Sequence, residues 1–504
     1  MTWTPTWTPD EAVVLEGLQQ RNSERDAALD KIFEKEAKPR KWNWPPEALE
    51  IVKKAQDDKA NVEELLTRDL VKLYTWPSEE LARDDVLIEG KGAFVTFNRK
   101  RTWIEDLGFY KFQTDYTFSD NWDKERMVVT FFVPKGLPAG YKAPVMWFFH
   151  GGGFCTGAGD FPAWYSQTSV QKAIDKKAII IAPDYPLGPE GNYKDIVDSI
   201  QDFLNWYKEE GSLEPRSESW TQWLYNQEPK QDFIIDKDHV YIEGESAGGH
   251  AAVTAMWLNA TKGGTNLPID VALLRYPMIA HYARNWDECA KATKQDGKVD
   301  FMGSLFTKEE VKSRKEDIEK VINELEDRGL VPTCSSRWPA VGMAFAFVLS
   351  VTERWQWFFQ RRHKLADPKK QKESDYMDGI ERVEHTHAEV EHDLLPPIYI
   401  IHGDEDKNCP PKNTKRFVET LRKTYPTRYK DDKTLRLDIV DMISKKPHSD
   451  EGRPMVLNNA KEVGHAFDYS LDEKNEKFLR DAYDWIGAYW KPSKSDSLSS
   501  SLKD

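Results

Sequence analysis

The feature that most constrains this sequence is a short turn between an apolar strand and a helix. The run VYIE at 240–243 is followed directly by GESAG at 244–248, and a helical segment, HAAVTAMWLNA, comes next. A serine on so sharp a turn has a strained backbone, and only small residues fit beside it. The turn lifts the hydroxyl clear of the sheet and places a helix start behind it, where the dipole favours negative charge. The pattern predicts that Ser246 is a nucleophile.

Beyond residue 109 the chain alternates between strand-like and helical runs. Several strand-like runs are apolar throughout, which is typical of strands covered on both faces. The expected strands are 109–118, 127–134, 145–150, 178–183, 240–245, 271–279, 397–403 and 435–441. The expected helices are 163–177, 193–210, 248–262, 413–426 and 476–490. This alternation predicts an α/β fold with a mostly parallel central sheet and helices on both faces.

Three consecutive glycines follow the expected strand at 145–150, within the motif HGGGF at 150–154. Glycines leave backbone N–H groups unshielded, so that these groups can point at an oxyanion. A plain Gly-rich turn is the alternative, and for an isolated triplet it would be preferred. Because this triplet lies one strand–helix–strand unit before the serine turn, we interpret it as an oxyanion loop.

An acid and a base complete the expected site. Asp406 lies in HGDED after the apolar run PIYII, and a catalytic acid is expected at the carboxyl end of a late strand. Asp404 and Glu405 are immediate alternatives to it. His465, in GHAF before the last helix, is the expected base, and His448 is a rival that lacks small flanking residues. The order serine, acid, histidine is that of α/β-hydrolases.

Together, HGGGF, GESAGG and the segment DYPLGPE at 184–190 resemble motifs of the hormone-sensitive-lipase-like carboxylesterases, the α/β-hydrolase fold-3 family. The resemblance covers residues 110–490. DYPLGPE departs from the family's usual DYRLAPE within a structural turn, and GHAF replaces the commoner H-G-F arrangement around the histidine. The resemblance implies an α/β-hydrolase fold in which the N–H groups of Gly152, Gly153 and Ala247 form the oxyanion hole.

These residues predict a serine hydrolase that cleaves carboxylic esters through an acyl-enzyme on Ser246, with His465 as base and Asp406 as its orienting acid. We expect a small or medium hydrophobic ester as the substrate, and neither a cofactor nor a metal. Two alternatives stay open. The acyl group could pass to another alcohol instead of water, or the chain could be a non-catalytic, ligand-binding member of the fold.

Charge and composition limit the binding partners and the cellular location that we expect for this protein. The 504 residues carry a formal net charge of −14, which disfavours nucleic acid. The longest apolar run, 341–351, is too short to span a bilayer, so we expect no stable membrane insertion. The opening MTWTPTWTPDEAV has no secretory pattern, and the four cysteines lie far apart, so we expect a cytoplasmic protein. A homodimer is left open.

Three histidines in the segment ERVEHTHAEVEHD, at 385, 387 and 392, raise the question of a metal site. They lie in a polar, acidic stretch, and no cysteine joins them. A solvated segment is the better interpretation.

The expected catalytic core is interrupted by a long insertion, with 91–278 and 396–492 as core and 279–395 inserted. The insertion carries an apolar run and the aromatic residues Trp355, Trp357, Phe358 and Phe359. We predict that it folds as a cap over the carboxyl ends of the strands and selects the substrate. A surface elaboration far from the pocket is the alternative. Residues 1–90 should form a helical cap region beside it, as in the family that the chain resembles, and 493–504 a disordered tail.

Overall fold

The computed structural model describes most of the expected core. Its longer described stretches are 108–116, 127–160, 165–188, 191–208, 219–230, 232–280, 377–406, 408–441, 463–468 and 476–491. Shorter pieces are 88–89, 95–96, 298–301, 304–307, 309, 346, 355, 359, 471 and 473. Apart from these pieces, the cap region predicted at 1–90, most of the insertion and the tail at 493–504 lie outside the described residues.

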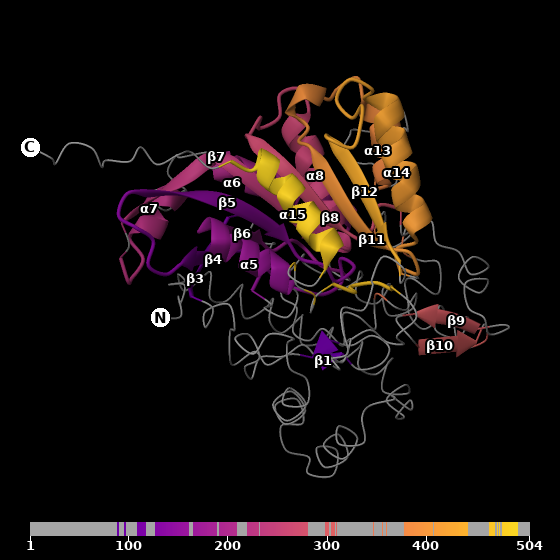
Figure 1. The fold of residues 1–504 in the computed structure, drawn as a ribbon, viewed down its shortest axis with the longest axis horizontal. Helices are drawn as coiled ribbons and strands as arrows, with labels where there is room; N and C mark the ends of the chain where they lie inside the picture. Colours follow the sequence, from indigo (N-terminus) through magenta and orange to yellow (C-terminus); the bar gives the residue numbers. More distant parts are fainter. Residues whose placement is uncertain are drawn as a thin grey trace, which may run out of the picture.

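Eight strands form one twisted sheet, in the order β12-β11-β8-β7-β5-β6-β4-β3 (Figure 1). Neighbouring strands from β6 across to β12 run parallel, whereas β4 is antiparallel to both β3 and β6. The strands are β3 (Phe109–Asp115), β4 (Val128–Pro134), β5 (Tyr141–Phe149), β6 (Ile179–Pro183), β7 (Phe233–Glu245), β8 (Ile269–Arg275), β11 (Ile398–Gly403) and β12 (Leu435–Val440). The mostly parallel sheet predicted from the sequence is confirmed.

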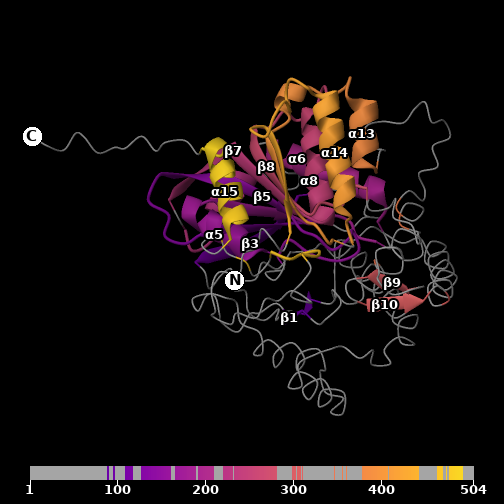
Figure 2. The same cartoon turned by 45° about the vertical axis from the view of Figure 1, so that its right-hand side comes forward.

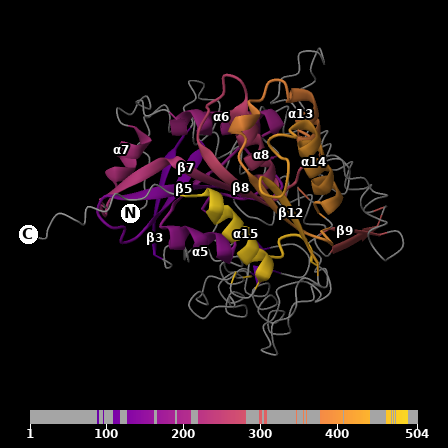
Figure 3. The same ribbon diagram turned by 45° about the horizontal axis from the view of Figure 1, so that its top comes forward.

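Helices cover both faces of this sheet, and Figure 3 shows the sheet between the two layers. One layer holds α5 (Gln167–Lys176) and α15 (Lys477–Tyr489). The other holds α6 (Tyr193–Lys208), α7 (Trp220–Tyr225), α8 (Ala247–Ala260), α13 (Gly379–Thr386) and α14 (Pro411–Thr424), with a short 3-10 turn at His392–Leu394. The helices α7 and α13 are additions to those expected from the sequence.

The two hydrophobic cores follow from the alternation of side chains along each strand. On β5, Trp147 points toward the α6 layer and meets Tyr207 edge-on, with ring centroids 4.8 Å apart. The next residue, Phe148, points to the other face and stacks on Tyr165 at 4.0 Å. Because both faces are covered, the central strands need apolar residues at every position, which explains their unbroken apolar runs.

The central helix α8 is buried on nearly all sides, since 13 of its 14 residues are buried. A helix that is apolar all round belongs inside the protein rather than on its surface. Its sequence, AGGHAAVTAMWLNA, meets this requirement with small residues at its start, where it approaches β5 and β7 closely. The residue that precedes it is Ser246, so the helix fixes the position of the expected nucleophile.

The last part of the predicted insertion lies against the core. The chain leaves the core after Ile279, and the N–H of Gly379 donates to the Ile279 carbonyl at 3.2 Å. From there α13 packs against α14 and α8, and Figures 1 and 2 show α13 and α14 side by side. The buried face of α13 includes Ile380 and Val383, whereas His385 on the same helix is exposed. The first part of the segment 381–393 therefore belongs to a helix with one buried face, and its three histidines are exposed.

The strands before and after the insertion, β8 and β11, are neighbours in the sheet and pair in parallel. Two short antiparallel pairs lie outside the main sheet. These are β1 (Ile88–Glu89) with β2 (Val95–Thr96), and β9 (Lys298–Phe301) with β10 (Ser304–Thr307).

Candidate active site

Ser246 occupies the turn between β7 and α8. Its φ of 51° and ψ of −118° lie in a region that residues with a side chain rarely adopt. The turn requires close backbone contacts, since a Cβ at Gly244 would come within 2.2 Å of the Gly248 carbonyl oxygen. A Cβ at Gly248 would come within 2.0 Å of the Phe149 carbonyl oxygen. These distances are the steric reason for glycine on both sides of the serine.

His465 lies on a described segment, 463–468, that follows the last strand. Its Nε2 is 2.9 Å from the Ser246 Oγ, and its Nδ1 is 2.8 Å from an Asp406 oxygen. The structure therefore brings the three residues singled out as nucleophile, base and acid into one continuous chain of hydrogen bonds. They come from positions far apart in the sequence, and the carboxyl ends of β7 and β11 supply two of them.

Asp406 is buried and well supplied with hydrogen bonds. Its Oδ1 accepts from the backbone N–H groups of Asn408 and Cys409, both at 2.9 Å. Its Oδ2 lies 3.2 Å from Nε2 of His402 as well as beside His465. Burial by itself raises the pKa of Asp406, but the nearby His465 and the hydrogen bonds from both histidines outweigh it. The pKa therefore lies well below its ordinary value, and the carboxylate stays ionised.

The alternative acids lie elsewhere. The N–H of Asp404 donates to the Val440 carbonyl, and that of Glu405 donates to the Val463 carbonyl. Burial and the neighbouring Glu405 raise the pKa of Asp404, the opposite of the shift at Asp406. Among the described residues, Asp406 is the carboxylate within hydrogen-bonding distance of the His465 Nδ1.

The rival base His448 lies outside the described residues. Of the three clustered histidines, His385 and His387 belong to the exposed side of α13 or its end, and His392 begins the short 3-10 turn. In the part of the chain that the structure describes, no three His, Cys, Asp or Glu side chains come close enough together to hold a metal ion.

The HGGGF loop turns sharply beside the β7–α8 turn that carries Ser246, which we call the elbow. Gly152, Gly153 and Phe154 all have positive φ angles, of 97°, 62° and 58°. Its first residue, His150, is buried and stacks on the Tyr185 ring, with centroids 4.3 Å apart and planes only 7° from parallel. Burial lowers the pKa of His150 to about 4, although its hydrogen bond to the Gly151 carbonyl acts in the other direction. This neutral, buried side chain anchors the start of the loop.

Two aromatic residues of the insertion lie against this loop. A Cβ at Gly153 would be 3.0 Å from the Trp355 ring, and the Phe359 ring lies 5.8 Å from that of Phe154. Trp355 and Phe359 also contact each other, and both are buried. Trp357 and Phe358, the other members of the predicted aromatic cluster, have no described side chains.

Two further residues at the site carry no sequence signal of their own. His402 contacts Asp406, and its Nε2 donates to the Cys409 carbonyl, 2.6 Å away. Tyr276 directly follows β8, and its ring meets that of His465 at a centroid distance of 4.8 Å. Both depend on contacts between distant segments. A tyrosine at a strand end is too common a pattern to identify in advance.

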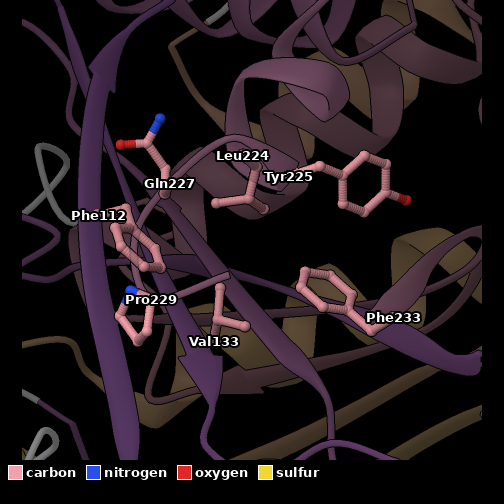
Figure 4. Close-up of a pocket in the computed structure, with 7 residues that line it drawn as sticks. All are labelled: Phe112, Val133, Leu224, Tyr225, Gln227, Pro229 and Phe233. Carbon is pink, nitrogen blue, oxygen red and sulfur yellow. The ribbon is translucent and has the colours of Figure 1, made fainter. Parts of the chain in front are cut away.

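A concave patch elsewhere does not belong to this site. Phe112, Tyr225 and Phe233 line it with four other residues, as Figure 4 shows. Phe233 begins β7, whereas Ser246 follows the other end of that strand. The patch lies between β3, β4, α7 and the start of β7, away from the residues of the site.

Comparison with known proteins points to the same class. Residues 146–334 match the family model described as alpha/beta hydrolase fold, and 338–442 match the prolyl oligopeptidase family model. The probable carboxylesterase M8 of Phoma sp. is 33% identical over 118 residues, which are 23% of this chain and 33% of that protein. Carboxylesterase 20 of Arabidopsis thaliana is 28% identical over 158 residues, 31% of this chain and 43% of that protein.

The chain thus matches less than half the length of these relatives. A solved hyperthermophilic esterase from Pyrobaculum calidifontis superposes with a TM-score of 0.40 at 13% identity, over 75% of this chain and 83% of that one. The sheet order and the family model, rather than this similarity, establish the α/β-hydrolase fold. The match over residues 146–334 includes both HGGGF and GESAGG, and the chain is similar to the fold-3, hormone-sensitive-lipase-like carboxylesterases. No helix among the described residues is long and apolar enough to cross a membrane.

Proposed function

We propose that this protein is a serine hydrolase that cleaves carboxylic esters, with Ser246 as nucleophile, His465 as general base and Asp406 as the acid that orients it. The observation that carries the proposal is the hydrogen-bond chain from Ser246 Oγ to His465 Nε2, at 2.9 Å, and from His465 Nδ1 to Asp406, at 2.8 Å. Its geometry suits transfer of the serine proton, because each contact lies within the range of a normal hydrogen bond.

In the first half-reaction, the Ser246 oxygen attacks the ester carbonyl as its proton moves to His465 Nε2. A carbon–oxygen bond forms, and the carbonyl oxygen takes the negative charge. His465 then gives the same proton to the alcohol oxygen as the ester bond breaks, which leaves an acyl group on Ser246. The ionised Asp406 holds the neutral imidazole of His465 in its Nδ1–H tautomer and stabilises the imidazolium once that forms.

The oxyanion needs N–H donors placed in advance. We assign this role to Gly152, Gly153 and Ala247, since the first two lie in the positive-φ loop beside the elbow and the third opens α8. Ala247 is also at the start of a helix, where the dipole favours negative charge. Loss of one such donor typically costs about 3–4 kcal/mol of activation free energy.

In the second half-reaction, water replaces the alcohol and attacks the acyl carbonyl while His465 Nε2 takes its proton. The proton then passes to Ser246 Oγ as the acyl bond breaks, which releases the carboxylic acid and restores the enzyme. Three relatives bear esterase names, which supports a small-molecule ester as substrate. Neither a metal nor a cofactor is needed for any of these steps.

Ser246→Ala tests the proposal directly. The variant should fold like the wild type and lose nitrophenyl-butyrate hydrolysis by about a millionfold. An organophosphate should label wild-type Ser246 and leave the variant unlabelled, as read by mass spectrometry of the labelled peptide. Retention of ester hydrolysis by Ser246→Ala would refute the assigned nucleophile.

Amide hydrolysis is a second candidate, favoured by two specific matches. Residues 338–442 match the prolyl oligopeptidase family model. A relative from rat, 26% identical over 136 residues, is named arylacetamide deacetylase. Parallel assays on nitrophenyl acetate and on its amide counterpart, nitroacetanilide, separate the two activities. We expect the ester to be cleaved faster, and a higher kcat/KM for the anilide would reverse the assignment.

A further inference from the structure

Tyr276 is placed under unusual constraint beside the catalytic histidine. It follows β8 directly and is fully buried, yet its φ of 36° is positive. For a large side chain this backbone conformation costs free energy, and such strain persists only where the surrounding structure imposes it. Its N–H donates to the Ile401 carbonyl at 2.7 Å, and its ring meets the His465 ring at 4.8 Å and 63°.

The hydroxyl of Tyr276 lies between two buried carboxylates. It is 3.0 Å from Asp468 Oδ1 and 3.3 Å from Glu245 Oε2. Glu245 immediately precedes the nucleophile, and its Oε1 accepts the Gly151 N–H of the oxyanion loop at 3.3 Å. One phenol thus connects the loop that carries the histidine to the residue beside the serine and to the HGGGF motif.

Asp468, three residues after His465, has a second buried partner besides Tyr276. Its Oδ2 accepts from the guanidinium of Arg275, whose Nε donates to Glu243 Oε1 at 2.6 Å. Arg275 also donates to Ser169 at 3.0 Å and to the hydroxyl of Tyr483. All of these groups are buried, so the network is desolvated, and every contact in it is costly to break.

We propose that Tyr276 is a positioning residue that holds the His465 imidazole between Ser246 and Asp406, with Asp468 and Glu245 as the two anchors of its hydroxyl. The inference rests on the function proposed above. The ring of Tyr276 limits rotation of the imidazole, and its hydroxyl ties the 463–468 segment to the elbow. Loss of the hydroxyl frees the segment without removing any reacting group.

Tyr276→Phe isolates the hydroxyl, because the ring that faces His465 remains. The matched control is Tyr241→Phe. Tyr241 is equally buried, and its hydroxyl donates to Glu243 at the opposite end of the same network, away from His465. Both variants remove one buried phenol, so they should lose comparable stability in urea unfolding followed by tryptophan fluorescence.

Only Tyr276→Phe should impair catalysis. We expect its kcat for nitrophenyl butyrate to fall about tenfold or more at unchanged KM, since a misplacement of about 1 Å can cost on the order of 100-fold. Organophosphate labelling of Ser246 should slow by the same factor. Tyr241→Phe should keep wild-type values of kcat and labelling rate, normalised to titrated active sites.

A proton NMR measurement separates this inference from the proposed activity, because it needs no substrate. The downfield signal of the His465 Nδ1–H, assigned by its loss in His465→Gln, should broaden or shift in Tyr276→Phe and stay unchanged in Tyr241→Phe. If wild-type activity is absent, the NMR signal still decides the positioning role. A Tyr276→Phe variant with wild-type kcat and an unaltered signal would overturn the inference.

A second variant covers the case in which Tyr276→Phe yields too little folded protein. Glu245→Gln keeps the side-chain size but removes the charge that faces the Tyr276 hydroxyl and the Gly151 N–H. We expect a smaller fall in kcat and in labelling rate than in Tyr276→Phe, again at unchanged KM. Wild-type kcat in Glu245→Gln would argue against the carboxylate anchor.

Discussion

At the scale of single residues, the carboxylates after β11 differ sharply although they are neighbours in the sequence. Asp406 is ionised and surrounded by donors, namely two backbone N–H groups and two histidines. Asp404 lies among other acidic residues, and its pKa is raised by burial, Glu405 and Asp441. Two residues of separation thus decide which side chain can orient a base.

This difference predicts unequal effects of two conservative substitutions. Asp406→Asn should lower kcat by about 10⁴, because the amide no longer fixes the tautomer of His465 or stabilises its charged form. Asp404→Asn is the matched control and should leave kcat within about twofold, since its side chain is not part of the proton path. Steady-state kinetics on nitrophenyl butyrate provide the measurement. The reverse pattern would move the acid to position 404 and leave the fold unaffected.

At the scale of elements, a buried polar cluster joins α13 to the core beneath the elbow. Arg382 donates to Thr254 at 2.8 Å and to the Tyr193 hydroxyl, which links α13 to α8 and α6. His250, four residues after Ser246, donates through Nε2 to the Met377 carbonyl at 2.6 Å, just before α13 begins. Burial, together with the Arg382 charge, lowers the pKa of His250 to about 3.

The depressed pKa makes this contact sensitive to acid. From the ordinary value of 6.5 down to about 3, the unfolded chain binds a proton that the folded chain excludes. The stabilising contribution is therefore complete above pH 6.5 and is lost as the pH falls toward 3, at about 1.4 kcal/mol per pH unit. His150 adds a loss of the same sign down to about pH 4.

His250→Gln should flatten this dependence, because the amide can still donate to the Met377 carbonyl but does not titrate. Urea unfolding between pH 4.5 and 7 should show a slope of stability against pH that is smaller by about 1.4 kcal/mol per unit than in the wild type. His387→Gln, on the exposed end of α13, is the control and should keep the wild-type slope. An equal slope in His250→Gln and the wild type would show that His250 titrates normally.

At the scale of the whole molecule, what the sequence could predict depended on how local each signal was. The elbow around Ser246 is set by contacts within a few residues, so Gly244 and Gly248 could be recognised directly. The parallel sheet could be predicted from apolar runs for a similar reason. Tyr276, Asp468 and Arg275 form their contacts across long stretches of chain, and neither spacing nor residue type marks them. The sequence analysis did not predict α13, because the buried face of this helix includes the charged residue Arg382. A charged side chain in a polar segment is normally expected to face solvent.

Contacts among the described residues suggest a different end for the insertion predicted at 279–395. The Gly379 N–H bonds to Ile279, and α13 packs within the α8–α14 layer. We therefore propose that the insertion returns to the core near residue 379 rather than at 395. A loop whose ends meet can carry a long folded segment at little entropic cost to the core. The position of Trp355 against Gly153 supports the proposal that this segment covers the site as a cap.

Trp355 should then limit the size of the substrate. Its ring is in contact distance of Gly153, a proposed oxyanion donor, so a smaller residue opens space directly beside the reacting carbonyl. We expect Trp355→Leu to raise the ratio of kcat/KM for nitrophenyl octanoate over acetate by about tenfold or more, since each methylene accommodated is worth roughly 1–3 kcal/mol. Hydrolysis of the acetate itself should stay near the wild-type rate, because the triad is untouched. Trp223→Leu replaces a buried tryptophan of α7 that packs against Phe131, so it is the control for lost packing and should keep the wild-type ratio. If Trp355→Leu and Trp223→Leu lower stability alike and neither alters the ratio, the insertion is a surface elaboration and the substrate is selected elsewhere.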